Sequence, residues 1–308
     1  MFDALGTLFS SDALYSSAFQ FSVLFAFAAS GEWVAERAGT LNISVEGMLL
    51  AGAFGAVVGH QSTGSAIVGL VVGVLFGLLV GSVQANLSHR LTANQFVVGL
   101  ALNVLVLGLT AYLDSSIGFD PARAAVIEIP GLVDLPLIGS AVFGRPWPAY
   151  LVYPLVPLLW WAVFRTRWGL EVRSVGENPQ AADVSGIDVN ARRRQAICVT
   201  GVTCGLGGAF LVLGQVGTFQ SGIVNGRGFI ALAAVIFGGW TLRGTLVGCV
   251  LFGFVEALTL SIPANGYSID PFILKAAPYV VALTVVLAFA TRVRQPRALA
   301  LPFVRGLT

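Results

Sequence analysis

The sequence predicts an all-α polytopic integral membrane protein. Apolar residues make up 56% of its 308 positions and charged residues only 10%, and the mean hydropathy is +0.85. A soluble domain needs far more charge to cover its surface. The apolar residues gather into stretches separated by polar loops, which predicts about nine transmembrane helices, within a range of eight to ten. Residues 1–308 are therefore interpreted as a single transmembrane domain in a lipid bilayer.

Five spans are predicted in the first half of the chain, at about 14–31, from about 46 onward, and at about 65–85, 93–113 and 149–164. The third carries a glycine at every fourth position from Gly69 to Gly81, a narrow face on which a neighbouring helix can pack closely. Glu36 and Arg37, between the first two spans, are expected at a membrane surface.

Asn42 and Glu46 are expected on one helical face at the start of the second span. A carboxylate that faces lipid is costly, so Glu46 should face protein or water. The alternative is an interfacial first turn, where an acid also favours the helix dipole.

Four spans are predicted in the second half, at about 195–213, after residue 226, and at about 246–262 and 271–290. The seventh consists of a polar, glycine-rich piece followed by about a dozen apolar residues, which is short for a full crossing. A broken or re-entrant helix that lines a cavity is predicted there, because free backbone groups survive only where protein or water satisfies them. Glu256, read as the lone mid-span carboxylate, is expected to face a protein partner.

Charge predicts the orientation of these spans. Arginines gather at 86–91, in 165–194 and in the C-terminal tail, whereas the loops at 114–148 and 263–270 are acidic. Because cytoplasmic loops carry the excess of basic residues, the arginine-bearing loops and the C-terminus are predicted to be cytoplasmic and the N-terminus outside.

No catalytic constellation is apparent. The three cysteines (Cys198, Cys204 and Cys249) lie in apolar segments without metal-ligand spacing, and the two histidines are isolated. Lys275 does not follow a glycine-rich phosphate loop, so the chain has no ATPase motif of its own. We expect a protein that is not an enzyme, with no metal, cofactor or nucleic-acid partner.

The polar stretch from Glu171 to Arg194 interrupts the apolar chain and carries its own helix signals. Asn178 can cap a helix, Pro179 suits its first position, and Gly186 suits its left-handed exit. A short helix over Pro179–Ser185 is therefore predicted. The alternative is an ordinary loop whose arginines only set the topology.

Gly176-Glu177-Asn178-Pro179, with Ala181-Ala182 and Gly186-Ile187, resembles the coupling loop of ABC importer permeases in the branched-chain amino acid, ribose and nucleoside group. In that family this helix docks in a groove of the ATPase subunit. The resemblance implies a cytoplasmic coupling loop at 165–194, in which the ATPase-coupling residues are Glu177, Asn178, Pro179, Ala181, Ala182, Asp183 and Gly186.

Two other regions carry the same resemblance. Asn42 to Gly47 resembles the family's N-terminal signature, and residues 92–113 and Gly226 to Ala234 are most similar to its nucleoside-type branch. The chain departs from the family at Thr241-Leu242-Arg243, where a proline-containing turn is expected. In all, the resemblance covers most of residues 30–260.

The resemblance implies a type II ABC importer-like fold and a permease subunit for nucleosides in a bacterial cell (inner or plasma) membrane. It implies ABC ATPase subunits, a second permease subunit that is either identical or different, and an extracytoplasmic substrate-binding protein. A simple-sugar permease of the ribose or galactose type, or a branched-chain amino acid permease, is the alternative within the family. An ion-coupled carrier is the alternative outside it.

The substrate path is expected along the permease interface, at polar and aromatic residues of the second, fourth and seventh spans. Uncharged amides suit a ribose or a base edge, and phenylalanine suits stacking on a base, although amides in a bundle often join helices instead. The candidates are Asn42, Glu46, Gln95, Asn103, Gln215, Phe219, Asn225 and Phe229.

Overall fold

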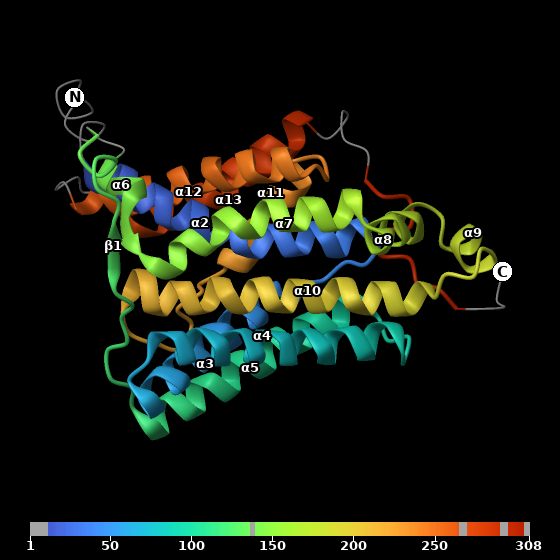
Figure 1. Ribbon diagram of the computed structural model, residues 1–308, viewed down its shortest axis with the longest axis horizontal. Coiled ribbons are helices and arrows are strands. Elements are labelled where there is room, and N and C mark those ends of the chain that lie inside the picture. The colour runs from blue at the N-terminus through green and yellow to red at the C-terminus, as the bar shows by residue number, and fades with distance from the viewer. Residues whose placement is uncertain (1–11, 136–138, 265–269, 290–294, 305–308) are drawn as a thin grey trace.

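The structure is a computed structural model that describes residues 12–135, 139–264, 270–289 and 295–304. The chain is mostly helical (Figure 1). Its helices are α2 (Asp12–Arg37), α3 (Val45–Thr63), α4 (Ala66–His89), α5 (Gln95–Ile117), α6 (Gly139–Phe143), the 3-10 helix η1 (Trp147–Leu151), α7 (Val152–Arg165), α8 (Arg167–Glu177), α9 (Pro179–Val184), α10 (Val189–Phe210), the π-helix η2 (Leu211–Val216), α11 (Arg227–Phe237), α12 (Leu242–Ala264) and α13 (Pro271–Phe289).

Every predicted apolar stretch contains a helix. Among the described residues, six helical segments are long and apolar enough to cross a membrane, which confirms a polytopic membrane protein. They are α2, α4, α5, η1 with α7, α10 with η2, and α12. The glycine-rich piece before α11 leaves that helix with only 11 residues, as expected for a broken segment.

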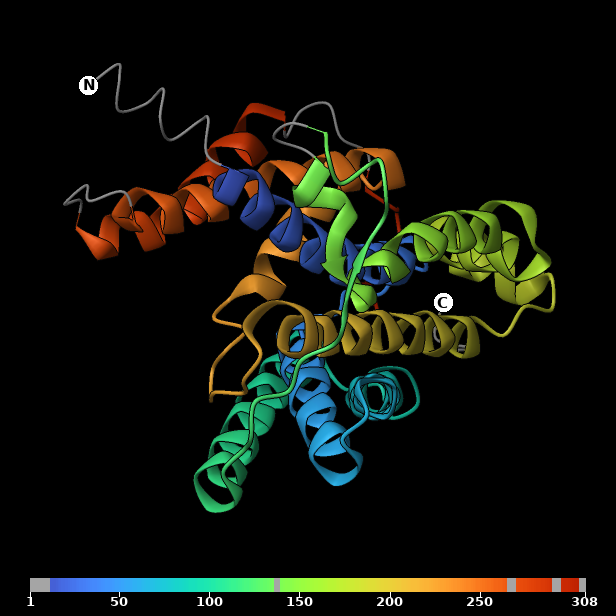
Figure 2. The same ribbon diagram turned by 60° about the vertical axis from the view of Figure 1, so that its left-hand side comes forward.

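Helix α10 lies at the centre of the bundle. It runs between a group formed by α3, α4 and α5 and a second group that contains α2, α7 and α12 (Figures 1 and 2). The predicted glycine face of α4 makes this arrangement possible. A Cβ at Gly77 would lie 2.5 Å from the Gly201 carbonyl oxygen of α10, and one at Gly73 would lie 2.7 Å from the Gly52 carbonyl oxygen of α3. Only glycine permits helices to approach so closely.

The C-terminal end of α2 holds two buried acids, Glu32 and Glu36. Glu36 was expected at a membrane surface, but it is fully buried and accepts a hydrogen bond from the Trp240 indole. Glu32, one helical turn earlier, is also fully buried. Glu256 is therefore not the only acid in a long apolar helix, because α2 also contains Glu32 and Glu36, which accept hydrogen bonds from Asn42 and Trp240.

The 114–148 loop contains regular structure that its composition did not predict. Strand β1 (Val126–Glu128) pairs antiparallel with β2 (Gly144–Pro146). Backbone bonds from Ala122 N to Gly217 O and from Ala124 N to Leu213 O, both 2.8 Å, tie the loop to η2 and its C-cap residue. The loop is thereby fixed to one end of the bundle, opposite α8 and α9 (Figure 1).

Candidate functional site

The short helix α9 forms as its sequence predicts and ends at Val184, with Ser185 as its C-cap. The Asn178 side chain accepts a 3.0 Å hydrogen bond from Ala181 N, and Pro179 occupies the first turn. Gly186 has a φ of 87°, a left-handed conformation that glycine adopts without steric cost. These local signals bound the helix on both sides.

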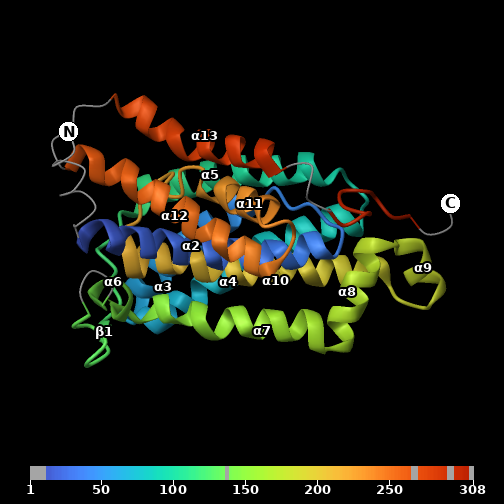
Figure 3. The ribbon, with the colours of Figure 1, turned by 90° about the horizontal axis from the view of Figure 1, so that it is seen from above.

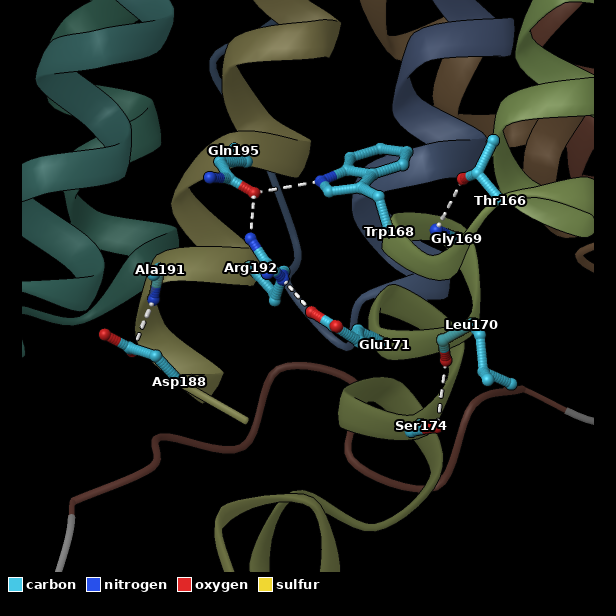
Figure 4. Close-up of polar contacts among 10 residues, drawn as sticks. All are labelled: Thr166, Trp168, Gly169, Leu170, Glu171, Ser174, Asp188, Ala191, Arg192 and Gln195. Carbon is cyan, nitrogen blue, oxygen red and sulfur yellow. Dashed lines mark hydrogen bonds and ion pairs between the residues drawn. The ribbon is translucent and has the colours of Figure 1, made fainter. Parts of the chain in front are cut away.

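A polar network joins α8 to α10, the two helices on either side of α9 in the sequence (Figure 4). Gln195 Oε1 accepts from the Trp168 indole at 2.9 Å and from Arg192 Nη1 at 2.8 Å, and Arg192 also pairs with Glu171. Asp188 caps α10 by accepting from Ala191 N at 2.8 Å. The two helices that flank α9 are therefore fixed to each other.

The two faces of α9 differ. Ala182 is only 4% exposed and packs with Val175, Val189 and Phe303. Val184 is 89% exposed, and Glu177, Asn178, Ala181 and Gly186 are exposed as well, whereas Asp183 is half-buried and Pro179 buried. Of the two adjacent alanines, only Ala181 faces outward. Val184 was not among the predicted coupling residues, although it is the one apolar side chain at the end of this capped helix.

A second feature is a cavity of about 580 Å³ between α3, α5, α11 and α13. It brings together four of the predicted path residues: Glu46, Asn103, Asn225 and Phe229. Tyr279 of α13 also lines it and was not predicted, because its position depends on how α13 packs on α11. The remaining lining residues are Gly47, Leu50, Leu100, Val104, Leu107, Gly222, Val224 and Gly226.

Two of these side chains hold the cavity wall together. The Glu46 carboxylate accepts 2.7 Å hydrogen bonds from the backbone N–H groups of Gly226 and Gly228 at the start of α11. Asn103 of α5 donates to Ile43 O at 2.9 Å and accepts from Gly47 N at 2.8 Å. A carboxylate at a helix N-terminus is stabilised by the helix dipole, so Glu46 fixes the short helix to α3.

The structure does not place the other four predicted path residues in this cavity. Asn42 precedes α3 rather than sharing a helical face with Glu46, and it is bonded to Glu32 at 3.1 Å. Gln95 accepts from Leu41 N at 2.9 Å. Phe219 stacks edge-to-face on Phe54 and Phe119. Gln215 lies in η2, where its Oε1 has no hydrogen-bond partner among the described residues.

Two cationic residues lie near the cavity in the sequence, Arg227 and Lys275. Arg227 pairs with Glu256 at 3.1 Å and lies 4.9 Å over the Phe21 ring. This contact confirms the expected partner of Glu256. Lys275 belongs to α13, and its side chain lies outside the described residues.

Known proteins are similar in sequence to this chain over most of its length. The family described as "branched-chain amino acid transport system / permease component" matches residues 14–291. A nucleoside ABC transporter permease of Lactococcus lactis subsp. cremoris is 32% identical over 91% of this chain and 93% of its own length. A guanosine ABC transporter permease of Bacillus subtilis is 32% identical over 90% and 92%.

A putative glucose ABC transporter permease of Haloferax volcanii is 37% identical over 84% of this chain and 80% of its own length. The family match covers α2 to α13, and thus both the loop around α9 and the cavity at α11. The chain belongs to the branched-chain amino acid transport system permease family, the transmembrane permeases of ABC transporters.

Proposed function

We propose that this chain is the permease subunit of an ABC importer that carries nucleosides through the cavity between α3, α5, α11 and α13. The observation that carries the proposal is the composition of that cavity, which combines a carboxylate, two amides and two aromatic rings. Hydroxyls and base edges suit the polar groups, and a flat base suits Phe229 or Tyr279. The names of the Lactococcus and Bacillus relatives agree with this chemistry.

The charges around the cavity favour a neutral solute. Glu46 lies in its wall and Arg227 is paired with Glu256. An anionic solute would meet the carboxylate without a free arginine among the described lining residues. This argument disfavours a carboxylate-bearing amino acid as the solute.

A simple sugar is the second candidate, favoured by the glucose permease relative. Sugars share the hydroxyl groups of a nucleoside but lack its base. Proteoliposomes that contain the complete complex should take up labelled uridine or adenosine, and unlabelled nucleosides should compete. Effective competition by free glucose or ribose, or none by any nucleoside, would reject the nucleoside assignment.

The proposed topology has nine spans, in which α3 and α13 are full crossings and α11 is a partial one. Helices α8 and α9 lie at the same end as the last described residues, and β1 lies at the other (Figures 1 and 3). The arginines of 165–194 support a cytoplasmic position for the first end. The strands and the N-terminus would then lie outside.

The proposed partners follow from this orientation. Helix α9 would dock on an ABC ATPase subunit through its exposed residues, with Val184 as the apolar contact. A second permease subunit, identical or different, would complete the solute path, and a substrate-binding protein would deliver solute at the outer end. Cross-linking a cysteine at position 184 to the ATPase subunit in the assembled complex tests the docking.

A further inference from the structure

Arg193 differs from its neighbours at the start of α10. Its side chain is fully buried, and it donates to three backbone carbonyls: Leu301 O at 2.7 Å, and Ala298 O and Ala38 O at 3.3 Å. A buried guanidinium is stable only where acceptors surround it. Two of its three acceptors belong to the C-terminal segment, so Arg193 ties that segment to α10.

We define Pro296–Phe303 as the C-terminal strap. Its backbone bonds to two other segments, from Ala298 N to Gly176 O at 3.0 Å and from Ala300 N to Gly39 O at 3.2 Å. Ala300 has a φ of 62°. A non-glycine residue keeps this left-handed conformation only where its surroundings fix it. The strap is therefore held in one path between the end of α8 and the loop that joins α2 to α3.

The strap ends against α9. Phe303 is 9% exposed and packs with Val175 of α8, Ala182 of α9 and Val189 of α10. Phe303 thereby closes the inner face of α9. A helix of six residues is too short to be stable by itself, so α9 depends on this contact for its orientation.

We infer that the C-terminal strap, anchored by Arg193, positions α9 for productive contact with the ATPase. Phe303 packs on the buried side of α9 and fixes its position. The backbone bonds to Gly176 and Gly39 connect the strap to α8 and to the loop that leads into α3. A movement of α9 would then shift the strap and, through it, the loop that precedes α3. This role rests on the proposed docking of α9.

The hold of the strap on α9 can be tested without the ATPase. In full-length permease lacking its three cysteines, Ala182→Cys reports whether the inner face of α9 is covered. Adding Phe303→Ala should speed its reaction with a water-soluble maleimide about tenfold, because the cover is lost. Phe303→Leu should largely restore protection, and Val304→Ala, which changes the exposed neighbour, should have no effect. Equal rates in all variants would overturn the inference.

The positioning role is tested in the complete complex. Phe303→Ala should increase the ATP hydrolysed per solute imported by at least about fivefold, the low end of typical coupling energies. Phe303→Leu should restore the ratio and Val304→Ala should leave it unchanged. If Ala182→Cys is labelled faster but the ATP hydrolysed per solute stays the same, Phe303 only packs against α9. That result would overturn the positioning role.

Failure of the proposed docking gives a different result. A cysteine at Val184 would then not cross-link to the ATPase even with the strap intact. That outcome would reject the docking and the positioning role together. Faster labelling of Ala182→Cys in the isolated permease would still establish the strap's hold on α9.

Discussion

The carboxylate of Glu46 accepts a 2.7 Å hydrogen bond from the backbone N–H of Gly228, although 182 positions separate the two residues. A second bond from Gly226 N makes the contact bidentate. It joins the first turn of α3 to the first turn of α11 and forms one wall of the cavity. Glu46 is thus a structural element of the proposed solute path.

Replacing Glu46 with glutamine should loosen α11. The amide has one acceptor oxygen, so one of the two glycine N–H groups loses its partner. Hydrogen bonds to charged groups contribute about 1.5–3 kcal/mol, so the thermal unfolding midpoint of the purified permease should fall and solute uptake should drop about tenfold or more. Gln61→Glu, at the exposed end of α3, is the matched control. An unchanged midpoint and rate would contradict the anchoring role.

Phe229 should distinguish nucleosides from sugars. Its ring is 40% exposed and lines the cavity, and stacking on a base is worth roughly 1–3 kcal/mol in single-strand binding proteins. Phe229→Ala should slow nucleoside uptake severalfold, near the lower end of that range, while basal ATP hydrolysis continues. Phe272→Ala, at an exposed α13 position outside the described cavity lining, serves as the control. Equal uptake by both variants would argue against stacking.

The sequence predicted features whose causes are local. Helix α9 was predicted because Asn178, Pro179 and Gly186 set its ends within a few residues. The membrane-spanning helices were predicted because a continuous run of about 20 apolar residues is itself the signal for a span. The short α11 was predicted because a glycine-rich piece leaves too few apolar residues beside it.

The roles of side chains whose partners are distant in the sequence could not be predicted from local patterns. Gln95 and Asn42 look like solute ligands in isolation, but Gln95 accepts from Thr40, 55 positions away, and Asn42 bonds to a buried acid of α2. Tyr279 enters the cavity only through the packing of α13 on α11. The same holds for Arg193, whose acceptors lie more than 100 positions away in the strap.

Cysteine labelling should establish the topology. In a variant without Cys198, Cys204 and Cys249, a cysteine at Gln180 should react only from the cytoplasm and one at Arg123 only from outside. Both positions are exposed in the structure, so the membrane alone decides access. Inside-out and right-side-out vesicles, treated with an impermeant maleimide, provide the comparison. Labelling of both positions from the same face would overturn the proposed number of spans between them.

The two faces of α9 should respond differently to an added carboxylate. Val184→Asp changes a side chain that is 89% exposed, so the thermal unfolding midpoint of the permease should stay the same while ATP-driven uptake falls through loss of the ATPase contact. Ala182→Glu places a charge among Val175, Val189 and Phe303. Burying an unpaired charge costs several kcal/mol, so this variant should unfold the α9 region and lower the midpoint as well as uptake. Uptake by Val184→Asp at the unmodified rate would show that α9 does not dock through this residue. A normal midpoint for Ala182→Glu would show that the inner face of α9 opens readily to water.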